Sequence, residues 1–173
     1  MLIRKAEAQD LNAISAVYDL IHTEEESGRL TIGWQRGIYP VFHTAQMALE
    51  QDDLFVMEDG GEIIGAAVIN QMQVDVYANG QWEKEAPEEA VMVLHTLVIS
   101  PLHAGKGYGK QFVRFYEEYA LAHGCPHLRM DTNERNLAAR ALYKKLGYRE
   151  AGIVPCVFNG LRDVRLVLLE KNL

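Results

Sequence analysis

The spacing of apolar residues predicts two helices near the start of the chain. From Asp10 to His22, apolar side chains recur every three or four positions, as on one face of a helix. The pattern ends at the acidic run 24–26, which predicts a loop. A second helix is predicted over 44–51, and a short apolar stretch at 2–4 precedes both helices. The chain is therefore expected to start with a strand followed by two helices.

The next segment is typical of strands joined by tight turns. Residues 54–57 are apolar and predict a strand, and Asp59-Gly60-Gly61 predicts the turn that follows it. One long strand is predicted over 62–77. In its last part, Met72, Val74 and Val76 alternate with polar residues, which predicts a solvent-exposed face for that stretch. Asn79-Gly80 is typical of a hairpin turn. We therefore expect consecutive strands in this region.

The second half of the chain alternates between strand and helix patterns. The predicted strands are 91–99, 127–132, 148–154 and 164–170, and the predicted helices begin at Tyr108 and at Asn136. The order β-α-α-β-β-β-α-β-α-β-β predicts an α/β fold, with a mixed sheet and helices on its faces. No linker-like stretch interrupts this order, which predicts a single domain over 1–173.

Composition removes several classes of protein. Lys plus Arg is 17 and Asp plus Glu is 24, which gives a net charge of −7 and argues against nucleic-acid binding. No apolar run is long enough for a membrane span, and the N-terminus has no apolar signal core. The cysteines, Cys125 and Cys156, form no CxxC pair and predict reduced thiols in a cytoplasmic protein. The histidines show no metal-ligand spacing, so no metal site is expected.

The segment 97–110 carries the most informative chemistry. An apolar strand runs into a turn with Gly105, Gly107 and Gly109, and a helix begins there. Free N–H groups at a helix start, together with nearby lysines, favour an anion such as phosphate. Neither the Walker spacing nor the G-x-G-x-x-G dinucleotide pattern fits, because Ala104 and Lys110 stand where those motifs need glycine.

Two motifs together resemble the GNAT acetyltransferases. The loop Ala104-Gly105-Lys106-Gly107-Tyr108-Gly109 is similar to that family's pyrophosphate loop, with Ala104 where Arg or Gln is usual. The later stretch Asn136 to Tyr148 matches the family's Asn-x-x-Ala-x-x-Leu-Tyr helix and its Leu-Gly-Tyr stop. Asn136 and Tyr143 are seven residues apart and share one helix face. The resemblance covers about residues 91 to 154.

The resemblance implies an N-acetyltransferase that uses acetyl-CoA, bound in a cleft between two splayed parallel strands, 91–99 and 127–132. It implies that the first of these strands pairs with the pantetheine arm, and that Tyr143 protonates the leaving thiolate. The implied cofactor-binding residues are Leu97, Val98, Ile99, Ala104, Gly105, Lys106, Gly107, Tyr108, Gly109, Lys110, Asn136, Ala139 and Tyr143. A non-catalytic module that binds acyl-CoA is the alternative.

For the acceptor, the sequence offers candidates for a general base and for the walls of a pocket. Asp131 matches a strand position where the family often has an acid, and His95 is a second candidate base because it shares strand parity with Leu97 and Ile99. The resemblance implies that Trp34, Tyr39 and Phe158 border the acceptor pocket. The acceptor is expected to be a small-molecule or peptide amine. A homodimer is one predicted state, paired through the long 62–77 strand and the final hairpin.

Overall fold

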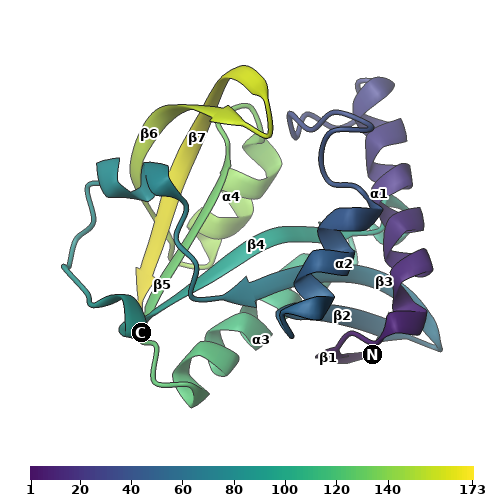
Figure 1. Cartoon of the computed structure of the whole chain (residues 1–173), viewed down its shortest axis with the longest axis horizontal. Helices are drawn as coiled ribbons and strands as arrows, with labels where there is room; N and C mark the ends of the chain where they lie inside the picture. Colours follow the sequence, from purple (N-terminus) through teal and green to yellow (C-terminus); the bar gives the residue numbers. More distant parts are fainter. The chain divides into compact units, whose positions relative to one another are not determined.

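The computed structural model describes all residues from Met1 to Leu173 and confirms the predicted order of elements (Figure 1). The strands are β1 (Leu2–Lys5), β2 (Leu54–Asp59), β3 (Glu62–Asn70), β4 (Val91–Ile99), β5 (His127–Asn133), β6 (Arg149–Phe158) and β7 (Leu161–Asn172). The helices are α1 (Leu11–Glu26), α2 (Phe42–Glu50), α3 (Tyr108–Ala122) and α4 (Leu137–Lys145). None of the helices has the length and apolar character that crossing a membrane requires.

The strands follow the order β1-β2-β3-β4-β5-β7-β6 in one mixed sheet, which confirms the predicted fold class. Strands β4 and β5 run parallel, and their pairing covers Val91–Leu94 against His127–Met130. The pairs β1–β2, β2–β3, β5–β7 and β7–β6 are antiparallel. Both parallel strands continue past their paired residues, β4 to Ile99 and β5 to Asn133.

The chain folds as two compact units, each assembled from segments that are distant in sequence. The first unit contains Met1–Leu30, Trp34–Ile69 and His95–Phe115. The second unit contains Thr31–Gly33, Asn70–Leu94 and Tyr116–Leu173. Strand β4 and helix α3 each contribute residues to both units, because the division falls within them.

Apolar burial in the first unit follows the helical and strand patterns. On α1 the side chains of Ile14, Val17, Tyr18 and Ile21 are buried. Four successive residues of β2, from Leu54 to Met57, are buried as well, which means that both faces of this strand are covered.

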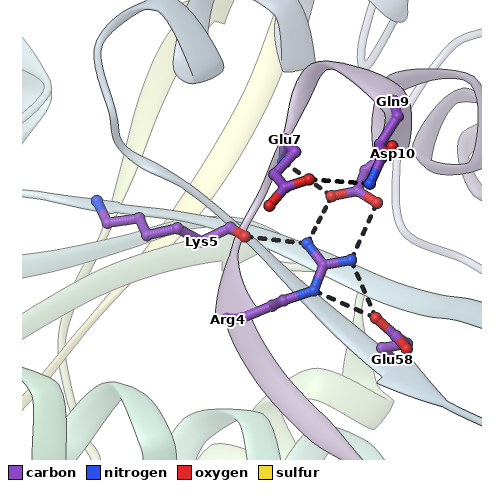
Figure 2. A network of polar contacts seen from close by, with 6 residues as sticks. All are labelled: Arg4, Lys5, Glu7, Gln9, Asp10 and Glu58. Atoms are coloured by element: carbon purple, nitrogen blue, oxygen red, sulfur yellow. Dashed lines mark hydrogen bonds and ion pairs between the residues drawn. The ribbon is translucent and has the colours of Figure 1, made fainter. Parts of the chain in front are cut away.

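A polar cluster around Arg4 ties three elements of the first unit together (Figure 2). The Arg4 guanidinium donates to Asp10 Oδ2 at 2.7 Å and Oδ1 at 3.1 Å, and to Glu58 Oε2 at 3.0 Å. The backbone N–H of Glu7 also donates to Asp10, at 2.8 Å. Asp10 is only 5% exposed, and the bond from Arg4 holds the pKa of its carboxyl below the usual range. This cluster joins β1, β2 and the start of α1 through charge-assisted hydrogen bonds.

In the second unit, the predicted end of one strand and one predicted turn are wrong. Strand β3 ends at Asn70 rather than at Tyr77, and Asp75–Asn79 form a 3-10 helix. Met72 is 64% exposed, so the alternating pattern marks a surface segment and not a buried strand face. Asn79-Gly80 ends this 3-10 helix and is no hairpin turn. The dimer stays a prediction, but it loses the long strand on which it partly rested.

The acidic run 24–26 is also placed differently from its prediction. It forms the last turn of α1 instead of a loop. Glu24 accepts two hydrogen bonds from Arg29, and Glu26 accepts from Arg36 at 2.8 Å. These arginines offset the repulsion among adjacent carboxylates, which allows the helix to continue through them.

The Arg4 cluster predicts an acid-sensitive stability. Arg4→Ala should lower the free energy of unfolding at pH 7 by about 2 kcal/mol, because a buried carboxylate loses its charged donor. Since folding lowers the pKa of Asp10, its contribution is full above the unfolded pKa and is lost as pH falls through the folded pKa. Urea unfolding at several pH values should therefore show a weaker acid dependence in the variant. The matched control Arg29→Ala, at an exposed pair, should leave stability almost unchanged.

Candidate functional site

In the first unit, the glycine loop joins β4 to α3 with an open backbone. A short 3-10 turn, Pro101–His103, follows β4, and α3 begins at Tyr108. Gly105 and Gly107 both have φ of +78°, a conformation that favours glycine. An added Cβ at either position would meet no atom within 4 Å. The loop thus presents bare backbone to open space.

Unpaired donors and positive charge gather at the start of α3. Gln111 N–H donates to the carbonyl of Gly107 at 3.1 Å, which closes the first turn of the helix. The N–H groups at the preceding helix positions have no intrahelical acceptor, and the helix dipole adds partial positive charge there. Lys106 and Lys110 are exposed beside this loop. These groups fit a phosphate-bearing ligand such as coenzyme A, as the sequence predicts.

The side chain of Tyr108 faces away from such a role. Its hydroxyl donates to Asp59 Oδ2 at 2.7 Å. The amino terminus of Met1 lies 3.2 Å from the same carboxylate, and the bond from Tyr108 is the main cause that lowers the pKa of Asp59. The hydroxyl of Tyr108 thus fixes the start of α3 to the end of β2, while its backbone N–H stays in the glycine loop.

Thr96 interrupts β4 in the middle of the predicted cofactor strand. Its φ is +50°, which is uncommon for a β-branched residue. A left-handed residue breaks the regular alternation of side chains, so strand parity no longer supports placing His95 on the same face as Leu97 and Ile99. The hydroxyl groups of Thr96 and Tyr39 are hydrogen bonded to each other, which holds this irregular position.

Two of the predicted acceptor-side aromatics meet in the first unit. The rings of Trp34 and Tyr39 pack edge to face, with centroids 5.8 Å apart. Tyr39 connects this pair to Thr96 of β4. The third predicted aromatic, Phe158, belongs to the second unit and packs against that unit's apolar cluster.

Helix α4 of the second unit carries Asn136 and Tyr143 as predicted. Asn136 Oδ1 accepts the backbone N–H of Ala139 at 3.1 Å and caps the helix. Tyr143 is 7% exposed, and its ring packs against Tyr148 with centroids 5.9 Å apart. Burial raises the pKa of the Tyr143 hydroxyl, and the charge of Asp131 raises it further. Tyr143 therefore stays protonated at neutral pH.

Asp131 on β5 has a partner that the sequence did not indicate. The hydroxyl of Tyr77, which the structure places on the β3–β4 connection, donates to Asp131 Oδ2 at 2.8 Å. Burial raises the pKa of Asp131, while the bond from Tyr77 acts in the opposite direction. Asp131 as a whole is half-buried. The second unit thus contains both a carboxyl group, Asp131, and a buried phenol hydroxyl, Tyr143.

The α1–α2 loop reaches β5 close to Asp131. An added Cβ on Gly33 would lie 2.3 Å from Nδ2 of Asn133, so the loop backbone touches this side chain directly. Asn133 lies two residues beyond Asp131, on the same face of the strand.

No group of His, Cys, Asp and Glu in the structure is arranged to hold a metal ion.

Comparison with known proteins identifies relatives that are acetyltransferases. The family model described as "Acetyltransferase (GNAT) family" matches residues 14–148. Streptothricin acetyltransferase of Escherichia coli is 29% identical over 89 residues, which are 51% of this chain and 48% of that protein, so the match spans about half the length of this relative.

Solved structures share the fold over almost the whole chain. A GNAT-family acetyltransferase from Streptococcus agalactiae superposes with a TM-score of 0.82 at 23% identity, covering 99% of this chain and 95% of that one. A Salmonella typhimurium protein solved with its cofactor acetyl-CoA has a TM-score of 0.67 at 17% identity, covering 99% and 93%. At these identities the likeness shows the fold.

The contact of Gly33 with β5 predicts a position that accepts no side chain. Gly33→Ala should lower the free energy of unfolding by about 2 kcal/mol, because the methyl group collides with Asn133 and the φ of +85° is strained. Gly37→Ala is the matched control, since its φ is +76° but its Cβ would meet no atom within 4 Å. Urea unfolding should show a clearly smaller loss for Gly37→Ala. Equal losses would contradict the steric argument.

Proposed function

The chain belongs to the acetyltransferase (GNAT) family, and we propose that it is an N-acetyltransferase that transfers the acetyl group of acetyl-CoA to a primary amine. One observation carries the catalytic part of this proposal: the second unit holds a buried tyrosine hydroxyl, Tyr143 on α4, together with a carboxyl group, Asp131 on β5, whose Oδ2 is oriented by the bond from Tyr77. A module that only binds acyl-CoA needs neither group. The amine acceptor is a small molecule or a peptide.

The proposed cofactor contacts use backbone more than side chains. We assign the pyrophosphate to the N–H groups from Gly105 to Lys110, with charge from Lys106, because this loop is open and its helix start has unpaired donors. Leu97, Val98 and Ile99 would pair with the pantetheine arm through their backbone. Ala104 contributes its backbone alone.

Asn136 and Ala139 complete the proposed contacts on α4. The Oδ1 atom of Asn136 caps the helix, which leaves its amide N–H groups to donate to the pantetheine. Ala139 keeps the helix face next to Asn136 free of bulk, since it carries only a methyl group.

Two side chains accept and donate the protons in the proposed reaction. Acetyl-CoA supplies the acetyl group as a thioester. Asp131 takes one proton from the acceptor ammonium, and the amine nitrogen then forms its bond to the acetyl carbon as the carbon–sulfur bond breaks. Tyr143 donates a proton to the leaving sulfur and recovers one from the acylated nitrogen. Asp131 finally passes its proton to solvent. His95 stays a second candidate base.

Two further parts of the proposal concern the whole chain. We propose that both units belong to one acetyltransferase domain, supported by β4 and α3, which run through both, and by the family match over 14–148. A cytoplasmic location is proposed as well, supported by the free thiols of Cys125 and Cys156. We place Trp34, Tyr39 and Phe158 at the acceptor side, where their aromatic rings would contact the acceptor.

The cofactor assignment predicts a loop variant that loses coenzyme A. Gly107→Ala should weaken coenzyme A binding roughly tenfold, because a left-handed alanine costs about 1–2 kcal/mol and favours another loop conformation. Gly28→Ala is the matched control, with φ of +74° and the same open surroundings at the end of α1. Isothermal titration calorimetry should find unchanged affinity for the control. No binding of coenzyme A by the wild type at millimolar concentration would refute the proposed function.

The proton-donor role of Tyr143 predicts a separation of turnover from binding. Tyr143→Phe should lower kcat by roughly a hundredfold, since the thiolate leaves without a donor, and should leave the KM for acetyl-CoA close to that of the wild type. Thiol release can be followed over a panel of amines: lysine, spermidine, an aminoglycoside and a peptide with a free N-terminus. Tyr148→Phe removes a hydroxyl from the neighbouring ring and should retain most of the activity. An unchanged kcat in Tyr143→Phe would remove the role.

A further inference from the structure

We infer that Tyr77 is a positioning residue for Asp131, and that the β3–β4 connection (71–90) thereby shapes the site that receives the acceptor as an ammonium ion. The inference rests on the proposed function, because it assigns the means by which the candidate base is oriented. The structural basis is the bond from the Tyr77 hydroxyl to Asp131 Oδ2 at 2.8 Å. This bond involves neither acetyl-CoA nor the glycine loop.

Tyr77 itself is held rigidly by the connection that carries it. Its side chain is only 2% exposed, and its ring packs edge to face on Trp82 with centroids 5.6 Å apart. The indole N–H of Trp82 donates to the carbonyl of Tyr77 at 2.8 Å, and the N–H of Gly80 donates to the same carbonyl at 3.0 Å. The hydroxyl therefore approaches Asp131 from one fixed direction.

Further contacts anchor the connection to the strands of the second unit. The N–H of Gln81 donates to the carbonyl of Ala151 on β6 at 2.7 Å. The N–H of Glu83 donates to the buried carboxylate of Glu170 on β7 at 2.8 Å. The guanidinium of Arg129 on β5 stacks over the Trp82 ring at 4.1 Å. Because these anchors reach three strands, the position of Tyr77 is set by the sheet itself.

No cationic side chain of the protein offsets the negative charge of Asp131. The Tyr77 hydroxyl is bonded to Asp131, and the charge of Asp131 also raises the pKa of the Tyr143 hydroxyl and of the Cys156 thiol. All three groups are neutral at pH 7, because the ordinary pKa of a phenol or a thiol lies above 7 and burial raises it further. The nearest cation along β5, Arg129, is bonded to Gln73 and faces Glu170. No lysine, arginine or histidine is paired with Asp131.

An acceptor ammonium would supply the missing positive charge. The bond from Tyr77 engages Oδ2 of Asp131, which leaves Oδ1 as the oxygen of this half-buried residue that would bind the ammonium and take its proton. The Tyr77 hydroxyl also favours the ionised carboxylate against the effect of burial.

The decisive experiment is the pH profile of Tyr77→Phe with the best amine of the panel. Phenylalanine keeps the ring but removes the hydroxyl, so the pKa of Asp131 should rise and the acid limb of kcat/KM for the amine should move to higher pH. We expect roughly a tenfold loss of kcat/KM on the acid side of the profile, recovery at higher pH, and an unchanged KM for acetyl-CoA. A profile identical to that of the wild type would overturn the inference.

Two matched variants separate positioning from loosened packing. Tyr148→Phe removes another buried hydroxyl of the second unit, one that is not bonded to Asp131, and should leave the acid limb unmoved. Asp131→Asn removes the titrating group, and adding Tyr77→Phe to it should cause no further loss of kcat/KM. A shifted limb in Tyr148→Phe, or a further loss in the double variant, would show that Tyr77 acts through general packing.

A measurement that needs no turnover keeps this inference separate from the proposed function. The carbon-13 resonance of the Asp131 carboxyl can be titrated in the wild type and in Tyr77→Phe. A higher pKa in the variant supports the inference, and an unchanged pKa overturns it. If the wild type acetylates no amine in the panel, the proposed function fails, and this titration still decides whether Tyr77 controls Asp131.

Discussion

The hydroxyl of Tyr116 is the interaction on which the arrangement of the second unit depends. Tyr116 is fully buried on α3, and its hydroxyl donates to the carbonyl of Met92 on β4 at 2.6 Å and to that of Arg129 on β5 at 3.2 Å. One O–H is thus shared between carbonyls of both parallel strands inside an apolar core, where an unpaired carbonyl is costly. Within the second unit, the C-terminal part of α3 is thereby fixed to β4 and β5.

The chemistry is divided between backbone and side chains. The glycine loop offers N–H groups and needs little from its side chains, which explains how Ala104 can replace a larger polar residue. The proton transfer that we propose instead depends on the side chains of Asp131 and Tyr143, and burial raises the pKa of both. The net charge of −7 is compatible with both parts, because lysines lie beside the loop while Asp131 on β5 has no cationic partner within the protein.

Local patterns predicted those parts of the fold whose causes are local. The bounds of β4 and the cap of α4 follow from an apolar run and from an Asn three residues before the N–H that it binds. The strand predicted over 62–77 is confirmed up to Asn70, and its end was wrong because Gln73 and Tyr77 are fixed by distant partners on β5. Tyr77, Thr96 and Gly33 were missed for the same reason: their roles come from contacts with residues far along the chain, and no spacing in the sequence indicates them.

The anchored connection between β3 and β4 has a consequence for how such an enzyme can diversify. Its fixed points are a few buried contacts, while residues between them, such as Met72, lie at the surface. Substitutions between the anchors would alter the surroundings of Asp131 without disturbing the loop assigned to the nucleotide. Enzymes that descend from this chain could therefore change which amine they accept through single substitutions in this connection. The residues assigned to acetyl-CoA would stay the same.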